Sequence, residues 1–304
     1  MSSTPGSVWR LNHERAIHLD RPFLVGILNI TPDSFADGGV YNTPKQAVER
    51  ARRMRDEGAD AIDIGGESTR PGAKRINACQ QIDRVVPVIR AIRDAGIELA
   101  ITIDTTRAET ARAALRVGAD AINDVSAGME DDGMLSLASE SGCGLILMHR
   151  ERPPEEDQFS DQYTRAPVAG SITARVVESL RSVRDRAVDA GVHQQSIMLD
   201  PGLGFGKDVA QNLELIESSP SIVALGHPVM SALSRKSFVG RVGLGRDSEP
   251  SERLPATIAL SVMHLQRGAR VFRVHDVAAH RQALDAAWAM IVRNDGISAT
   301  ESAN

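Results

Sequence analysis

The amino-acid sequence predicts a single α/β domain, a (β/α)8 barrel of the TIM-barrel class with a short β-hairpin at its N-terminus. Short runs rich in Ile, Val and Leu alternate with longer amphipathic segments from Pro22 onward. Eight such runs occur in a chain of 304 residues, and eight strand–helix units typically occupy about 250 residues. Polar residues follow the end of every run. An open, doubly wound sheet is the alternative, which the absence of a G-x-G-x-x-G segment between a strand and a helix disfavours.

The apolar runs predict buried parallel strands, because such strands are covered by helices on one side and by the core on the other. The predicted strands are residues 23–30, 61–65, 99–103, 121–123, 144–148, 197–199, 229–233 and 270–274. Three helices between them have clear limits, at residues 44–57, 107–117 and 174–190, and each is followed by glycine. Thr43 is the expected N-cap of the first helix, with Pro44 at its first position.

The two ends of the chain are expected to lie outside the barrel itself. Residues 8–20 contain two short apolar segments that predict a hairpin closing the barrel floor. We therefore divide the chain into an N-terminal extension at 1–20, a barrel at 21–293 and a flexible polar tail at 294–304. No linker or low-complexity segment interrupts the alternation.

Composition excludes several classes of function. Lys and Arg total 35 against 40 for Asp and Glu, and the net charge of -5 argues against nucleic acid as the main partner. No apolar run approaches the ~18 residues of a membrane helix, and the polar N-terminus lacks the apolar core of a signal peptide. Cys79 and Cys143 are too few for a disulfide framework. We therefore expect a cytoplasmic protein that acts on small molecules.

The polar residues at the predicted strand ends converge on one mouth of the barrel, where (β/α)8 proteins carry their active sites. One Asp, Asn or Gly there is as often a helix cap or a turn residue as a functional group, and one His or Met is more often part of the core. Helix capping alone would not require polar candidates at all eight strand ends. They include Asn29, Thr69, Arg70, Asp104, Asn123, Met148, Asp200, Lys236, Arg273 and His275.

Two chemistries can be inferred from these candidates. Arg70, Arg273 and His275 form a cationic set suited to phosphate, because a guanidinium presents a planar fork of donors to phosphate oxygens. A second set combines two carboxylates, an amide and an ammonium, and it matches the donors and acceptors of a flat heterocycle with an amino group and a carbonyl. Its members are Asp104, Asn123, Asp200 and Lys236. The sequence thus predicts a ring site beside a phosphate site.

The motifs that carry these residues resemble those of the dihydropteroate synthase family. They are NITPDSF at 29–35, GESTRPG at 66–72, DT at 104–105, NDV at 123–125, DPGLGFGK at 200–207, SRKSF at 234–238 and RVHDV at 273–277. The resemblance extends in collinear order over about residues 8–292. The ordered set is specific, above all the loop at 66–72 and the segment at 234–238.

The resemblance implies condensation of 6-hydroxymethyl-7,8-dihydropterin diphosphate with p-aminobenzoate to give 7,8-dihydropteroate and diphosphate. It implies that Asp104, Asn123, Met148, Asp200 and Lys236 bind the pterin, and that Asn29 is a ligand of Mg²⁺, the implied cofactor. Thr69, Arg70, Arg273 and His275 would bind the diphosphate, and Phe35, Pro71, Phe205 and Ser237 the aminobenzoate. Arg70, Lys236, Arg273 and His275 would be catalytic. The family also implies a homodimer and a sulfonamide target in folate biosynthesis.

The chain departs from the family pattern after the strand at 144–148, where the family usually continues with a second Met, a Gly and a later Met-Gln. Here the segment is HRERPPEED at 149–157, beside the expected pterin site. Two alternative functions remain. A methyltetrahydrofolate:corrinoid methyltransferase would not need the cationic set of Arg70, Arg273 and His275. A non-catalytic pterin-binding paralogue would be expected to lack a site residue, and none is missing.

Overall fold

A computed structural model describes residues 8–12, 15–30 and 43–301, with side chains described as far as residue 293. Its main sheet has eight strands in the order β8-β7-β6-β5-β4-β3-β10-β9, and all neighbours are parallel. The strands are β3 Phe23–Asn29, β4 Ala61–Gly65, β5 Ala100–Asp104, β6 Ala121–Asp124, β7 Gly144–Met148, β8 Ile197–Asp200, β9 Met230–Ser231 and β10 Val271–Val274. A bridge between Leu199 and Val229 joins the two edges. The predicted (β/α)8 barrel is therefore confirmed.

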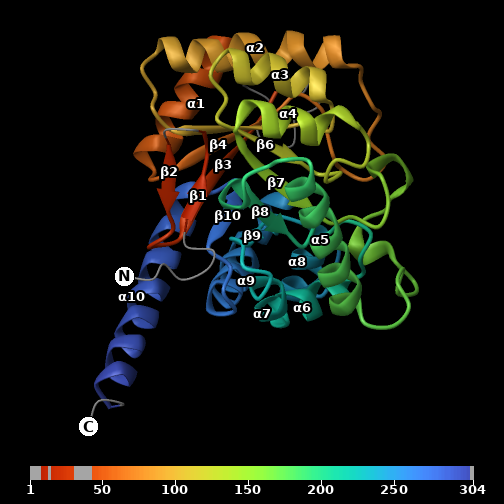
Figure 1. The fold of residues 1–304 in the computed structure, drawn as a ribbon. Coiled ribbons are helices and arrows are strands. Elements are labelled where there is room, and N and C mark those ends of the chain that lie inside the picture. Colours follow the sequence, from red (N-terminus) through yellow and green to blue (C-terminus); the bar gives the residue numbers. More distant parts are fainter. Residues whose placement is uncertain (1–7, 13–14, 31–42, 302–304) are drawn as a thin grey trace.

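Helices surround this sheet on its outer side (Figure 1). They are α1 Pro44–Asp56, α2 Ala78–Asp94, α3 Ala108–Arg116, α4 Gly133–Ser141, α5 Ile172–Asp189, α6 Val209–Glu217, α7 Ser219–Val223, α8 Ser237–Leu244, α9 Leu254–Gln266 and α10 Val277–Glu301. Thr43 caps α1 as predicted, and it forms a capping box with Gln46. Within the described ranges, no helix is long and apolar enough to cross a membrane.

Three elements differ from the prediction by two residues or more at one end. Only Met230–Ser231 of the predicted strand at 229–233 forms a strand, and Val229 adds a single bridge to Leu199. Helix α5 begins at Ile172 rather than 174, because the Ser171 hydroxyl accepts from the Ala174 N–H at 3.2 Å. Helix α10 continues to Glu301, beyond the limit we set at 293. No proline stops it there, and Figure 1 shows it extending away from the barrel.

The barrel floor is filled by the hairpin of β1 Val8–Arg10 and β2 Ala16–His18, which pair antiparallel as predicted. The Trp9 side chain is fully buried, and its Nε1 donates to the Ser196 carbonyl at 2.9 Å. Small residues at the strand starts make room for the indole, including Ala61, Ala100 and Ala121 in the same apolar cluster. A Cβ on Gly144 would lie 2.9 Å from the Trp9 ring. The floor is therefore closed to ligands.

Side chains alternate between the two faces of each strand, and this alternation places the predicted site residues on the inner face of the barrel, at the end opposite the floor. Asn29 pairs with Gly65, Gly65 with Asp104, and Asp104 with Asn123 across β3 to β6. Met148 pairs in the same way with Asp200 across β7 and β8. Because side chains at paired positions in neighbouring strands point to the same side, one ring of polar groups lines the mouth.

Candidate functional site

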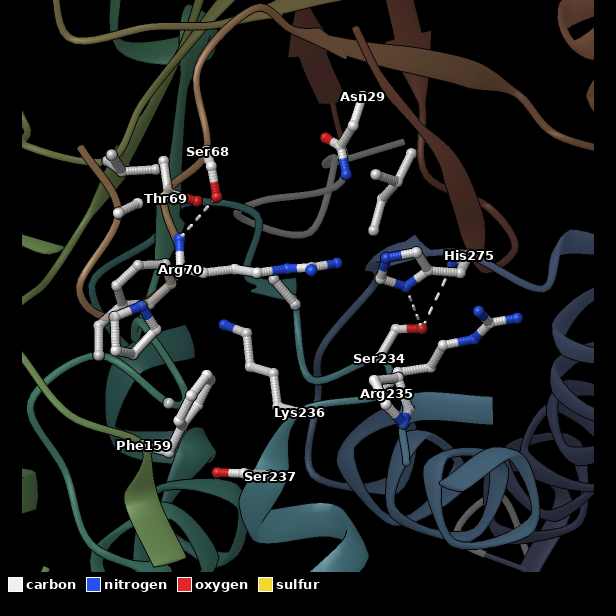
Figure 2. Close-up of a pocket in the computed structure, with 18 of the residues that line it drawn as sticks. Asn29, Ser68, Thr69, Arg70, Phe159, Ser234, Arg235, Lys236, Ser237 and His275 are labelled. Carbon is white, nitrogen blue, oxygen red and sulfur yellow. Dashed lines mark hydrogen bonds between the residues drawn. The ribbon is translucent and has the colours of Figure 1, made fainter. Parts of the chain in front are cut away.

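A cavity of about 1000 Å³ opens at the carboxyl end of the barrel strands. Thirteen of the predicted site residues line it, and Figure 2 shows part of its wall. They are Asn29, Thr69, Arg70, Pro71, Asp104, Asn123, Met148, Asp200, Phe205, Lys236, Ser237, Arg273 and His275. Phe35 lies outside the described residues. The structure thus brings together every predicted site residue that it describes.

Arg273 lines the cavity and lies between two carboxylates. Its Nε donates to Asp63 at 2.6 Å and its Nη2 donates to Asp104 at 2.9 Å. Burial alone would lower the pKa of Arg273, but the charges of Asp63 and Asp104 hold it above its ordinary value. The guanidinium is therefore charged and fixed before any ligand enters.

Asp104 has one oxygen committed to Arg273 and one without a partner. Its Oδ1 is buried and accepts no hydrogen bond from the described residues, and such an acceptor is costly to leave unsatisfied. Burial, and next the charge of Asp63, raise the pKa of Asp104 to about 7, although Arg273 opposes this. The site therefore presents an acceptor that an N–H donor of a ligand would satisfy.

Asp200 and Lys236 face the same cavity from β8 and the start of α8. The Asp200 carboxylate accepts from the Gly202 N–H at 2.7 Å, and burial raises its pKa. The Lys236 Nζ lies 4.3 Å from the centroid of the Phe205 ring and donates to the Leu203 carbonyl. Burial lowers the pKa of Lys236 to about 8, and Asp200 opposes the shift. The pair therefore combines a buried acceptor with a donor that is mostly charged at neutral pH.

The loop after β8, which carries Phe205, is held from inside by Lys207. Its buried Nζ donates to the carbonyls of Gly202 and Phe205, both at 2.9 Å. Burial lowers the pKa of Lys207 to about 7. Only glycine fits at 202, where φ is +66° and a Cβ would lie 1.7 Å from the His149 carbonyl oxygen. Lys207 therefore shapes the loop and does not line the cavity.

The atypical segment after β7 supports the same loop from outside. Asp157 accepts from the Gly206 N–H at 2.8 Å and from the Tyr163 hydroxyl at 2.6 Å. The segment also accepts a hydrogen bond from the β4–α2 loop, between the Gly72 N–H and the Pro154 carbonyl at 2.8 Å. Phe159 projects from it into the cavity wall (Figure 2). The segment that departs from the family pattern is thus hydrogen-bonded to both the loop after β8 and the β4–α2 loop, which bound the cavity.

His275 lies at the other side of the mouth, against Ser234 (Figure 2). The Ser234 Oγ accepts from the His275 backbone N–H at 3.2 Å and lies 3.0 Å from Nδ1. The Ser234 hydroxyl can donate to Nδ1 or accept from it, and donation would leave the ring proton on Nε2. Burial, followed by the charges of Arg235, Arg273 and Arg70, lowers the pKa of His275 well below 6.5. The ring is therefore neutral at neutral pH, and in the tautomer in which Ser234 donates to Nδ1 it would present Nε2–H as a donor.

The side chains that line the cavity could bind Mg²⁺ only if the substrate supplied further ligands. No group of three or more His, Cys, Asp or Glu side chains that could hold a metal ion occurs among the described residues. Asn29 supplies one amide oxygen at the mouth, on the same cavity as Arg70 and His275. Mg²⁺ keeps several waters and is commonly bound by one or two protein oxygens together with phosphates. Asn29 therefore fits an ion that arrives with a diphosphate.

Comparisons with known proteins identify the family. The model of the pterin binding enzyme family matches residues 25–275. A dihydropteroate synthase of Streptococcus pyogenes is 44% identical over 258 residues, covering 85% of this chain and 91% of that protein. The chain belongs to the dihydropteroate synthase family. The Mycobacterium leprae dihydropteroate synthase is 42% identical, with 86% of this chain and 90% of that protein covered.

Solved dihydropteroate synthases have the same fold. The Xanthomonas albilineans dihydropteroate synthase with 4-aminobenzoic acid superimposes with a TM-score of 0.83 at 38% identity, covering 94% of this chain and 98% of that one. The Yersinia pestis dihydropteroate synthase with a sulfonamide drug gives 0.84 at 34% identity, covering 92% and 98%. The resemblance inferred from the motifs is confirmed, and the methyltransferase alternative has no support among these relatives.

Sequence reasoning missed Asp63 and Phe159. Asp63 is fully buried in β4 and contacts two predicted dihydropteroate synthase site residues, Arg273 and Asn123. Its signal was a carboxylate in the middle of the apolar strand AIDIG, since an unpaired charge is almost never fully buried. Phe159 is 40% exposed although it is aromatic, and no strand-end pattern marks it.

Proposed function

We propose that this chain condenses 6-hydroxymethyl-7,8-dihydropterin diphosphate with p-aminobenzoate to form 7,8-dihydropteroate and diphosphate. The main support for this proposal is that the ring-binding set and the cationic set line the same cavity. Related structures support the substrates: a Thermus thermophilus dihydropteroate synthase has been solved in complex with 6HMPPP, and a Xanthomonas albilineans one in complex with 7,8-dihydropteroate.

The pterin ring is proposed to lie at the base of the cavity. The unpartnered Asp104 Oδ1 and the Asp200 carboxylate accept from its amino and ring N–H groups, and Lys236 donates to its carbonyl oxygen. Asn123 supplies its amide oxygen, because its Nδ2 already donates to Asp63 at 3.2 Å. Met148 packs against the ring. These donors and acceptors leave the ring one orientation.

The diphosphate is proposed to lie at the mouth, where Thr69, Arg70, Arg273 and His275 meet. Cleavage of the C–O bond leaves the electron pair on the diphosphate oxygen and a cation on the pterin methylene. Arg70, Arg273 and the His275 Nε2–H stabilise the charge where it develops. Mg²⁺ held by Asn29 would supply further charge neutralisation. The aryl amine then forms the C–N bond and loses one proton to solvent.

The aminobenzoate is proposed to bind between the loops that flank Lys236. Pro71 and Phe205 provide apolar walls and Ser237 provides a hydroxyl, while Phe35 would complete the pocket from outside the described residues. Enclosure by these loops excludes water, which would otherwise capture the methylene cation. This arrangement favours bond breaking before attack.

Turnover by the purified protein tests the proposal. We expect the protein to release diphosphate from the pterin substrate only when p-aminobenzoate is present, and to restore growth of a folate-requiring strain that lacks this activity. Pterin binding without turnover would instead indicate the non-catalytic paralogue.

Magnesium dependence gives a second expected result. Excess chelator should abolish activity, and Asn29→Ala should lower kcat at subsaturating Mg²⁺ because one amide oxygen ligand is lost. High Mg²⁺ should partly restore the variant. Full activity in chelator would contradict the assignment of Asn29, and an unchanged melting temperature would show that the fold is retained.

Pterin affinity should depend on pH through Asp104. The ionised carboxylate accepts a ligand N–H at its unpartnered Oδ1, whereas a protonated carboxyl could carry its proton there, and the pKa of Asp104 is about 7. Affinity for 6-hydroxymethylpterin, which lacks the diphosphate, should therefore rise with pH up to about 7 and level off above it. Titration calorimetry from pH 5.5 to 8.5 measures this, with Asp104→Asn as the control that should lose the pH-dependent step.

We also propose that the chain forms a homodimer in the cytoplasm. Exposed apolar side chains lie on the adjacent helices α8 and α9, at Val242, Leu244 and Met263, and they offer a surface for a second copy. Cys79 and Cys143 are free thiols, which is consistent with a reducing compartment. Light scattering should give the mass of a dimer, and Met263→Glu should lower it.

A further inference from the structure

Asp63 is a buried carboxylate that the proposed reaction does not use directly. It is fully buried in the middle of β4, and it is not among the residues that line the cavity. Three side chains donate to it: Thr102 from β5, Asn123 from β6 and Arg273 from β10. A buried charge is tolerated only when it is paired and hydrogen-bonded, and Asp63 has both kinds of partner.

The two oxygens of Asp63 have different partners. Oδ2 accepts from the Arg273 Nε at 2.6 Å and from the Asn123 Nδ2 at 3.2 Å, whereas Oδ1 accepts from the Thr102 hydroxyl. One oxygen therefore faces two cavity residues, and the other faces a residue of the barrel interior. The contacts with the cavity can be separated experimentally from the contact with the interior.

The Oδ2 contacts fix the orientation of both cavity residues. An ionised carboxylate only accepts, so the Asn123 amide must turn its NH₂ toward Asp63 and its oxygen away from it. Arg273 is held at Nε by Asp63 and at Nη2 by Asp104, which sets the plane of its guanidinium. Without Asp63, the amide could rotate and Arg273 would be held by Asp104 alone.

We propose that Asp63 is a positioning residue, which holds the Arg273 guanidinium and the Asn123 amide in the orientation that the pterin diphosphate requires. The inference rests on the proposed function and extends it to a residue that contacts no substrate. Both groups that Asp63 orients belong to the proposed substrate-binding set, one on the ring and one on the diphosphate.

Three variants test this proposal. Asp63→Ala removes the acceptor, and kcat/KM for the pterin substrate should fall about tenfold or more, since a hydrogen bond to a charged group is lost. Asp63→Asn can keep its amide oxygen toward Arg273 and Asn123 and its NH₂ toward the Thr102 hydroxyl, so it should recover most of this loss. Thr102→Val removes only the contact away from the cavity, and its kcat/KM should stay within about twofold of wild type.

A pH measurement distinguishes positioning from a general structural role. Asp104 is faced by Asp63, Asp124 and Glu67, which raise its pKa, and by Arg273, which lowers it; Lys236 also lies near it. Loss of the Asp63 charge in Asp63→Asn should therefore move the midpoint for 6-hydroxymethylpterin binding below about 7. Misfolding would not produce this shift in a protein with an unchanged melting temperature.

The outcomes are distinguishable. A folded Asp63→Ala variant with the kcat/KM of Thr102→Val, or an Asp63→Asn variant with an unmoved midpoint, would overturn the positioning role. If Asp63→Ala does not fold, the Asp63→Asn midpoint still decides. Absence of turnover in the wild-type protein would instead refute the proposed function, independently of the variants.

Discussion

His275→Ala is expected to lower kcat by roughly 10²–10³-fold, as the loss of one donor to a developing anion does in other enzymes. Affinity for 6-hydroxymethylpterin, which has no diphosphate, should barely change. The reason is that the charge on the leaving oxygen grows as the C–O bond breaks, so a donor at that oxygen stabilises the transition state more than the bound substrate. Single-turnover measurement of diphosphate release gives the rate, and calorimetry gives the affinity.

The structure specifies how His275 acts. Its pKa is well below 6.5 because of burial and the surrounding arginines, so the ring donates from a neutral state and is not a second cation. The Ser234 hydroxyl lies 3.0 Å from Nδ1, and a hydrogen bond donated by Ser234 would fix the tautomer that carries its proton on Nε2. Ser234→Ala is therefore a graded control, which should cost less than His275→Ala because the donor remains but its tautomer is no longer fixed. Equal weakening of diphosphate-free pterin binding and of kcat in His275→Ala would assign the residue to the ring instead.

The fold and most of the candidate site could be predicted because two local sequence signals agree. Alternation within strands and polar residues at strand ends place Asp104, Asn123 and Asp200 on one inner face. Local capping chemistry also predicted the start of α1 at Thr43. Each of these signals is contained within a few neighbouring residues, so it can be recognised without knowing the partners of a strand.

Contacts between distant segments could not be predicted in this way. The Asp63 Oδ2 of β4 and the Arg273 Nε of β10 lie 2.6 Å apart, with β3 between the two strands in the sheet. The sequence around one of these residues does not indicate that the other is its partner. The same holds for Asp157, which supports the Phe205 loop through Gly206 at 2.8 Å. A buried carboxylate in an apolar strand signals that a partner must exist, but the barrel closure determines which one.

Asp200→Asn is expected to weaken pterin-substrate binding by roughly 10- to 100-fold, because a charged hydrogen bond contributes ~1.5–3 kcal/mol. The amide oxygen can replace the Asp200 oxygen that accepts from the Gly202 N–H at 2.7 Å. The NH₂ group then takes the place of the second acceptor and faces the ring N–H donors. The variant keeps the loop and loses the acceptor.

Lys236 should amplify this loss. Burial lowers its pKa to about 8, and the charge of Asp200 is the largest influence opposing that shift. In Asp200→Asn the pKa of Lys236 should fall further, so that less of the donor to the pterin carbonyl is charged at neutral pH. As pH is lowered from 8 to 6, protonation of Lys236 in the variant should offset part of the loss that protonation of Asp104 causes, so affinity should rise less steeply with pH than in wild type.

Asp208→Asn is the matched control for Asp200→Asn, since it makes the same change in the same loop outside the cavity. Asp208 caps α6 by accepting from the Gln211 N–H at 2.8 Å, and Asn caps helices as well as Asp does. This control should bind 6-hydroxymethylpterin like wild type. If Asp200→Asn also keeps wild-type affinity and the wild-type steepness of the pH dependence, Asp200 does not contact the ring donors, and Asp104 with Asn123 must account for pterin recognition.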